Sequence, residues 1–351
     1  MTVPAPRPVR RAVAGVWRTR RRSVGVLAAL TAATLATGLL AGCSSSSGKV
    51  NLTLVAYSTP QAAYTQIIKA FQQTAAGKNV TFSTSYGASG DQSRAVDAGQ
   101  PADVVAFSLT PDVTRLVKDG LIAKDWDQDK YNGLVTDSVV VIATRKGNPK
   151  HISDWPDLIK GNTEVISPNP FTSGGARWNV MAAYGATSDL GKDPSAGNAY
   201  LAKLFSHIPV QDDSARKALQ TFTGGKGDAM IAYENDAIFA QQQGQPISYT
   251  IPKDTIKIEN PAAVTSNSKH PKQAQAFLDY LHSAAAQKIY ADNGYRPTTS
   301  GVSVDRTFPT PSGEFTINQL GGWTDVTDTF FDPDKGSLLA VEKKLGVSTS
   351  K

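Results

Sequence analysis

The chain has 351 residues and a formal net charge of +6. Residues 1–42 contain seven arginines and no acidic residue, so the remaining 309 residues have a net charge of −1. The positive charge therefore gives no reason to expect nucleic acid as a partner. A single cysteine excludes an intramolecular disulfide, and the length suits two lobes or one large α/β domain.

The N-terminal region has the layout of a secretory signal. The arginine-rich stretch precedes an uncharged apolar run at residues 24–40, and small residues follow it. Although this run approaches the lower limit of roughly 17 residues for a membrane span, it is rich in Ala, Thr and Gly. A serine tract at residues 44–47 then predicts a flexible tether.

The sequence Leu40-Ala41-Gly42-Cys43 resembles the lipobox of bacterial lipoproteins. The resemblance implies a signal peptide at residues 1–42, a lipidated Cys43 and a tether over residues 43–49. The protein would then be exported and anchored by lipid to the outer face of the cell membrane. The arginine run at residues 20–22 leaves general secretion and twin-arginine export both open.

Strand-like and helix-like segments alternate from residue 50 onward, which predicts an α/β fold with a parallel sheet and helices on both faces. We expect strands at residues 51–57, 80–86 and 103–107, and helices at residues 64–71 and 111–119. A further helix is expected through Val96 and Ala98, after a turn at residues 87–92. Ser58, Ser89 and Ser108 lie in the turns after these strands. Ligands of such sheets bind beyond the carboxyl ends of the strands.

The second half of the chain continues the alternation. Residues 137–144 are apolar and β-branched, which predicts a buried strand where the chain crosses to a second lobe. Beyond it we expect helices at 176–184 and 216–222, strands at 228–233 and 256–264, and one amphipathic helix at 272–290. The strand at 256–264 would return to the first lobe, and mixed helical patterns follow Phe308.

Ser173, Gly174 and Gly175 stand directly before a predicted helix. A serine there caps the helix, and two glycines leave its first amides open to a ligand. Helix starts of this kind bind anions. Similar polar turns open the helices after Gly87 and after Asp213, so three helix starts predict convergence on one small anion.

Motifs across most of the chain, from about residue 52 to 323, resemble those of the sulfate- and thiosulfate-binding proteins that serve ABC importers. The motifs stand in family order at residues 102–105, 145–149, 169–179, 213–216, 232–235, 295–297 and 321–323. The resemblance implies the type II periplasmic-binding-protein fold, with two α/β lobes, a hinge and an interlobe cleft. Its implied organisation is lobe 1 at 50–137 plus 256–300, lobe 2 at 138–255, and a C-terminal segment at 301–351 that packs on the lobes.

The resemblance also implies how the anion is bound. Carried over by motif, the donors are the amides of Ser89, Gly174, Gly175 and Ala215 and the hydroxyl of Ser173. Two positions depart from the family pattern, because Ser58 replaces an aspartate and Tyr233 replaces a tryptophan whose indole N–H points at the anion. We therefore expect sulfate, with thiosulfate as a related ligand and with molybdate or phosphate as the alternative.

Sulfate is fully ionised at neutral pH and can only accept hydrogen bonds, whereas protonated phosphate needs an acceptor as well. A carboxylate beside the anion would select for phosphate, and Asp91 is the candidate; we expect it to face solvent in the first turn of its helix. For Arg177, bracing of the loop before its helix is preferred over direct contact with the anion.

Other functions have weaker support in the sequence. The chain lacks a Gly-x-Ser-x-Gly elbow, a Gly-x-Gly-x-x-Gly turn after the first strand and any metal-ligand spacing of its four histidines. We therefore expect no enzymatic activity, no cofactor and no metal site. The expected partners are the oxyanion, the transmembrane subunits of an ABC permease and the membrane, with the protein itself a monomer.

Overall fold

The computed structural model describes residues 48–347 and residue 349. Cys43, the predicted signal segment and most of the predicted tether lie outside these residues. Within the described part of the chain, every helix is too short or too polar to cross a membrane.

The N-terminal strands form the parallel part of the sheet. β1 pairs with β2 on one side and with β3 on the other, and both pairings are parallel. Helices follow each strand, so the alternation predicted from the sequence is confirmed. The elements are β1 (Val50–Tyr57), α1 (Gln61–Phe71), β2 (Val80–Gly87), α2 (Ser89–Asp97), β3 (Val104–Ala106) and α3 (Thr110–Lys118).

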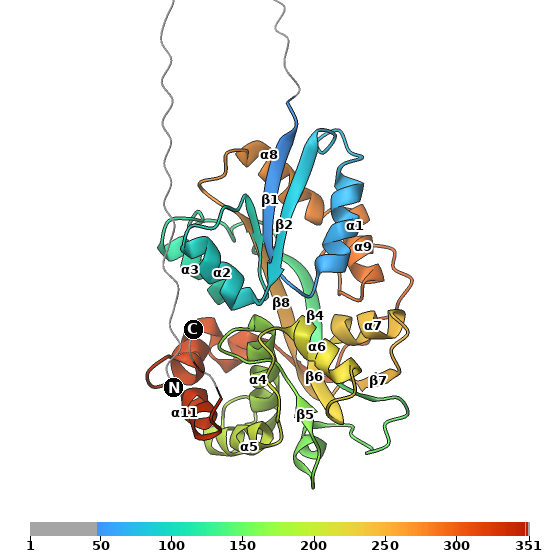
Figure 1. The fold of residues 1–351 in the computed structure, drawn as a ribbon, viewed down its shortest axis with the longest axis vertical. Helices are drawn as coiled ribbons and strands as arrows, with labels where there is room; N and C mark the ends of the chain where they lie inside the picture. Colours follow the sequence, from blue (N-terminus) through green and yellow to red (C-terminus); the bar gives the residue numbers. More distant parts are fainter. Residues whose placement is uncertain (1–47, 348, 350–351) are drawn as a thin grey trace, which may run out of the picture. The chain divides into compact units, whose positions relative to one another are not determined.

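Two long antiparallel strands, β4 (Leu134–Arg145) and β8 (Asp254–Val264), run through the middle of the fold (Figure 1). β8 pairs with β3 at one end, and β4 pairs with β6 (Ala229–Tyr233) and β7 (Ile247–Thr250) at the other. The path through the sheet is therefore β2-β1-β3-β8-β4-β6-β5, in which β5 is Val165–Ile166. Because β4 and β8 pair antiparallel with their neighbours on this path, the sheet is mixed, and the prediction of a parallel sheet is correct only in part. Because these two strands join the halves of the sheet, they are the crossing segments of a hinge.

The second half of the sheet is shorter and is covered by its own helices. Apolar residues of β4, β5 and β6 form a core there, with Val141, Ile166 and Met230 all fully buried. The elements are η1 (Trp155–Ile159), β5 (Val165–Ile166), α4 (Gly174–Thr187), α5 (Pro194–Ser206), α6 (Ala215–Thr223), β6 (Ala229–Tyr233), α7 (Glu234–Gln242) and β7 (Ile247–Thr250).

We call β1–β3 with α1–α3, α8 (Pro271–Leu281) and α9 (Ala284–Asp292) the first lobe, and β5–β7 with α4–α7 the second lobe. In the first lobe Leu52, Leu54 and Tyr64 pack with Phe277 of α8 in a separate core. The chain positions at which one lobe passes into the other, predicted near residues 137 and 256, stay a prediction.

The predicted single helix at 272–290 is wrong. The structure has α8 (Pro271–Leu281) and α9 (Ala284–Asp292), separated at His282 and Ser283. The Ser283 side chain accepts a hydrogen bond from the amide of Ala286 and caps the second helix. Apolar periodicity continues across the break, so the pattern alone did not reveal this new helix start.

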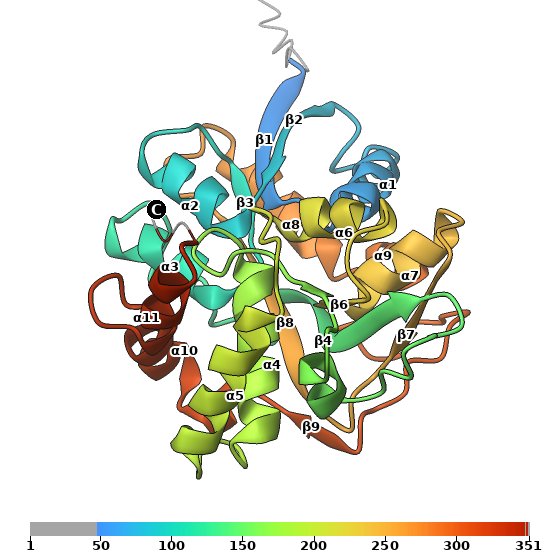
Figure 2. The same ribbon diagram turned by 60° about the horizontal axis from the view of Figure 1, so that its bottom comes forward.

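The C-terminal elements pack against the second lobe (Figure 2). The Trp178 and Trp323 rings meet edge to face at 4.7 Å, and Tyr184 meets Phe330 at 4.6 Å. The elements are β9 (Gly313–Phe315), η2 (Ile317–Leu320), α10 (Gly322–Val326), a π-helical turn η3 (Thr327–Phe331) and α11 (Ser337–Lys344).

Candidate functional site

A small cavity lies where the carboxyl ends of β1–β3 meet the starts of α4 and α6 and the end of β6. The volume of the cavity that is open to the centre of a water molecule is about 10 Å³, so only a compact ligand fits. Its lining residues are Tyr57, Ser58, Thr59, Gly87, Ala88, Ser89, Ser108, Ser173, Gly175, Ser214, Ala215 and Tyr233. Six of the seven predicted site residues are among them, and Gly174 is not.

The start of α4 is built by the loop before it. Ser173 is the N-cap residue, and its hydroxyl accepts from the Ala176 amide at 3.3 Å. Its own amide donates to the Asn169 carbonyl at 2.8 Å. The Ser173 amide is therefore occupied, whereas its hydroxyl hydrogen is still available to a ligand.

The two glycines of α4 face different neighbours. A Cβ added to Gly174 would lie 2.9 Å from the Ser108 side chain and 2.8 Å from Leu109, so this residue permits close approach of the first lobe. A Cβ on Gly175 would have its nearest neighbours at 3.5 Å, among them Ala215. Gly175 therefore borders the open cavity, and contact between Gly174 and an anion stays a prediction.

The amides at the three helix starts are open. Within the part of the chain that the structure describes, the backbone N–H groups of Ser89, Gly174, Gly175 and Ala215 donate to no acceptor. The first amides of a helix have no partner inside the helix, so they require a cap, water or a ligand. Three of these four residues line the cavity.

Ser89 is held by a carboxylate that sequence reasoning missed. Its hydroxyl donates to Asp112 of α3 at 2.6 Å and accepts from the Ser108 amide at 2.9 Å. Asp112 is itself buried. Because the Ser89 hydroxyl is used in this way, only its backbone amide is left for a ligand.

Charged side chains stay away from the cavity, whose lining contains no Asp, Glu, Lys, Arg or His in the described part of the chain. Asp91 pairs with Arg94 and is half exposed, which confirms that it faces solvent. Arg177 donates through Nε to the Pro170 carbonyl at 2.9 Å, so it braces the loop as predicted. Burial lowers the pKa of Arg177 to about 10, which leaves it charged at neutral pH.

Tyr233 reaches the cavity from the end of β6 and is buried. Its hydroxyl lies 2.7 Å from the Ser108 hydroxyl. Burial raises the pKa of Tyr233, so the phenol keeps its proton. Sequence reasoning put Ser108 at a strand end but did not include it in the site. Three further lining residues, Tyr57, Thr59 and Ser214, were also not among the predicted site residues.

The lobes are closed over this cavity. The Gly90 amide of α2 donates to the Thr172 carbonyl at 3.1 Å, and the Trp178 indole donates to the Ser108 carbonyl at 2.8 Å. Arg216 of α6 donates to the carbonyl of Thr59 at 2.6 Å. Each of these bonds joins one lobe to the other beside the cavity.

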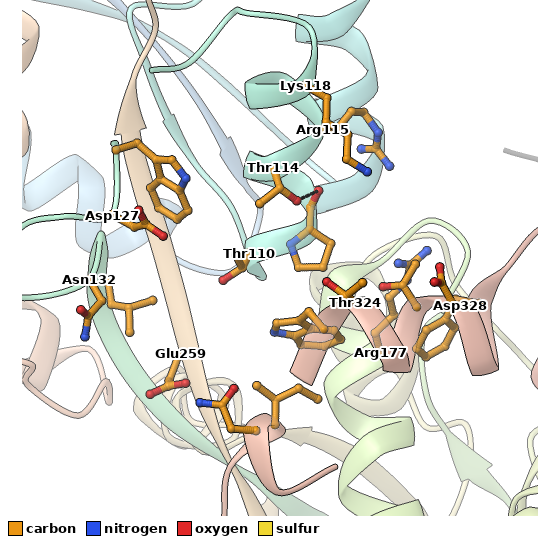
Figure 3. A pocket seen from close by; sticks show the side chains of 18 of the residues that line it. Thr110, Thr114, Arg115, Lys118, Asp127, Asn132, Arg177, Glu259, Thr324 and Asp328 are labelled. Carbon is orange, nitrogen blue, oxygen red and sulfur yellow. Dashed lines mark hydrogen bonds between the residues drawn. The ribbon is translucent and has the colours of Figure 1, made fainter. Parts of the chain in front are cut away.

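A larger crevice of about 710 Å³ lies between α3, the hinge strands and the C-terminal segment (Figure 3). Arg115, Lys118 and Arg177 line it, but so do four carboxylates, which are Asp127, Glu259, Asp328 and Asp332. Four acidic groups make it a poor site for a small dianion. The smaller cavity, with its open amides and hydroxyls, is the better candidate.

Two α/β lobes joined by two crossing strands, with a small polar cavity closed between them, define a solute-binding protein. The family model described as bacterial extracellular solute-binding protein matches residues 52–296. A sulfate-binding protein from Synechococcus elongatus is 40% identical over 330 residues, which cover 89% of this chain and 94% of the relative.

A thiosulfate-binding protein from Pseudomonas aeruginosa is 33% identical over 315 residues, covering 86% of this chain and 95% of the relative. The solved structure of the sulfate-binding protein SubI from Mycobacterium tuberculosis H37Rv is 44% identical, with a TM-score of 0.79, and covers 81% of this chain and 100% of that one. The chain belongs to the bacterial extracellular solute-binding proteins, in the family of the sulfate- and thiosulfate-binding proteins. It is an exported protein of the kind that serves transport.

Proposed function

We propose that this protein captures sulfate outside the cytoplasm and delivers it to an ABC permease, with thiosulfate as a second ligand. The observation that carries the proposal is a cavity bordered by amides without a partner, by hydroxyl groups and by no charged side chain. A fully ionised oxyanion accepts hydrogen bonds from such a site at every oxygen. A protonated phosphate would leave its own hydroxyl without a dedicated carboxylate acceptor.

The donors come from both lobes. Ser58 and Ser89 belong to the first lobe, and Ser173, Gly174, Gly175, Ala215 and Tyr233 to the second. An anion that contacts both sets favours the closed form, because the open form offers it only one set. A permease can then recognise the closed pair of lobes.

Hydrogen bonds carry more of the binding energy than helix dipoles do. Each bond to a charged group contributes about 1.5–3 kcal/mol, whereas one helix end contributes about 0.3–1 kcal/mol at the surface and up to about 2 kcal/mol in a partly buried site. Five or more such donors therefore contribute more than three helix starts do. Molybdate is the closest alternative ligand, because the same donors would bind a larger tetrahedral oxyanion if the cavity opened slightly.

Replacing Ser173 with aspartate tests this function. Ser173→Asp keeps a side chain that caps α4 but places a carboxylate beside the ligand, so we expect sulfate binding to be lost while the thermal unfolding temperature stays close to that of the unmodified chain. Sulfate binding that survives in Ser173→Asp would exclude this cavity as the site.

We also propose that the protein acts as a monomer and catalyses no reaction. A separate proposal is that it is anchored to the outer face of the membrane through lipid on Cys43. The support is the sequence Leu40-Ala41-Gly42-Cys43 directly after the apolar run. Metabolic labelling with a radioactive fatty acid should mark the protein in cells, and Cys43→Ser should abolish the label. Equal labelling of both forms would refute the anchor at this residue.

A further inference from the structure

The backbone of Ser108, in the turn after β3, has a partner at every polar group. Its amide donates to the Ser89 hydroxyl at 2.9 Å. Its carbonyl accepts from the Trp178 indole and from the Asn260 amide, both at 2.8 Å. Ser108 is almost fully buried, so its hydroxyl is the one polar group that is left for a further contact.

That hydroxyl is paired with the hydroxyl of Tyr233. The two oxygens lie 2.7 Å apart, and both residues line the cavity. The pair has two hydrogens, and the bond between the oxygens uses only one of them. The second hydrogen needs another acceptor.

The nearby protein acceptor is already occupied. The side-chain oxygen of Asn260 accepts from the Tyr57 hydroxyl at 3.1 Å and from the Thr136 hydroxyl at 3.2 Å. An amide oxygen has two lone pairs, so these two bonds fill it. The Asn260 side chain also lies close enough to Tyr233 to lower its pKa, but the two shorter bonds already fill its oxygen, so the remaining O–H of the Ser108–Tyr233 pair is left for the cavity.

We propose, on the basis of the function proposed above, that Ser108 and Tyr233 act together as one hydrogen-bond donor to the oxyanion. Ser108 donates to the phenol oxygen, and Tyr233 donates to the ligand. The phenol is the more acidic of the two hydroxyls and is the better donor to an anion. A bond accepted from Ser108 polarises it further.

The pair has a consequence for closure and for ligand choice. Ser108 belongs to the first lobe and Tyr233 to the second, so the donor is complete only when the lobes are closed. It requires an unprotonated oxygen on the ligand at this point of the cavity. Ser108 is therefore a positioning residue that acts through Tyr233.

A double-mutant cycle tests the inference. Sulfate is titrated calorimetrically into the exported chain and into its Ser108→Ala, Tyr233→Phe and doubly substituted variants. Tyr233→Phe should weaken binding about ten- to hundredfold, the loss expected for one bond to a charged group. Ser108→Ala should weaken it less, and the double variant should match Tyr233→Phe because Ser108 acts through the phenol. Losses that add, or an unchanged Ser108→Ala, would overturn the proposal.

A spectroscopic measurement separates this role from a merely structural one. Sulfate should change the near-ultraviolet absorbance of tyrosine in the unmodified chain, less so in Ser108→Ala and not in Tyr233→Phe. Equal difference spectra in all three would contradict the pair as donor. If the unmodified chain fails to bind sulfate at all, the proposed function falls; if it binds but the cycle is additive, only this inference falls.

Discussion

Gly175 offers the sharpest separation of binding from folding. It lies in the first turn of α4 and has an ordinary negative φ, so alanine fits its backbone. The new methyl group would lie 3.5 Å from the Ala215 side chain and 3.6 Å from the Tyr233 ring, which are ordinary contact distances. Because that methyl occupies the small cavity, Gly175→Ala should obstruct the anion without disturbing the fold.

Gly175→Ala is expected to leave stability level or slightly higher and to lower the affinity for sulfate. Alanine in a helix is favoured over glycine by about 0.5–1 kcal/mol, so the free energy of unfolding should stay level or rise slightly. Loss of one amide contact weakens binding by about 1.5–3 kcal/mol, and displacement of the ligand from the remaining donors adds to that loss. We therefore expect sulfate affinity to fall at least about a hundredfold.

Denaturant unfolding without ligand and calorimetric titration with sulfate measure the two effects on the same preparation. A Gly175→Ala variant that binds sulfate like the unmodified chain would refute the position of the ligand. A variant that is strongly destabilised would refute the reasoning from the contact distances.

Three further predictions follow from named contacts. Gly174→Ala should weaken sulfate binding by holding the lobes apart, because its methyl group would overlap the Ser108 side chain. Small-angle X-ray scattering with saturating sulfate should then show a larger radius of gyration than that of the unmodified chain, and an equal radius would contradict this. Asp91→Asn should leave sulfate affinity within about twofold, because this carboxylate does not line the cavity. Its exposed ion pair with Arg94 contributes only about 0–1 kcal/mol to stability. A larger change in affinity would place Asp91 at the ligand. Burial raises the pKa of Glu342 from 4.5 to about 7, although a hydrogen bond from Gln211 acts in the opposite direction. The folded protein therefore holds this proton more tightly than the unfolded chain does. Its free energy of unfolding should fall by up to about 3 kcal/mol as the pH rises from 4.5 to 7. Glu342→Gln should flatten that slope in denaturant titrations, and an unchanged slope would assign it to other groups.

The sequence predicted the parts of the site that depend on local chemistry. A serine followed by two glycines before an apolar helix defines Ser173, Gly174 and Gly175 as an N-cap and open first turn whatever surrounds them. Likewise, strand ends could be located by turn residues, and the carboxyl ends of parallel strands meet at one edge of a sheet. These rules located the turns at Ser58, Ser89 and Ser173, whereas Ala215 and Tyr233 were assigned by the family resemblance, and all five residues line one cavity.

What the sequence did not predict depends on contacts between distant segments. Ser108 and Tyr233 are 125 positions apart and meet only because the lobes close. Asp112 reads as an ordinary acidic residue in a first helical turn, yet it accepts the hydroxyl of Ser89. The break at Ser283 was missed because the apolar faces of two helices follow the same periodicity.

Calorimetric titration of the exported chain at neutral pH with sulfate, thiosulfate, molybdate and phosphate tests the central claim most directly. A cavity that binds through amides and hydroxyls alone predicts sulfate binding at micromolar or tighter concentrations and no heat from phosphate. If phosphate binds more tightly than sulfate, a carboxylate must face the ligand and the donor-only site is contradicted. If molybdate binds most tightly, the cavity is larger than sulfate requires and the assignment passes to the alternative oxyanion.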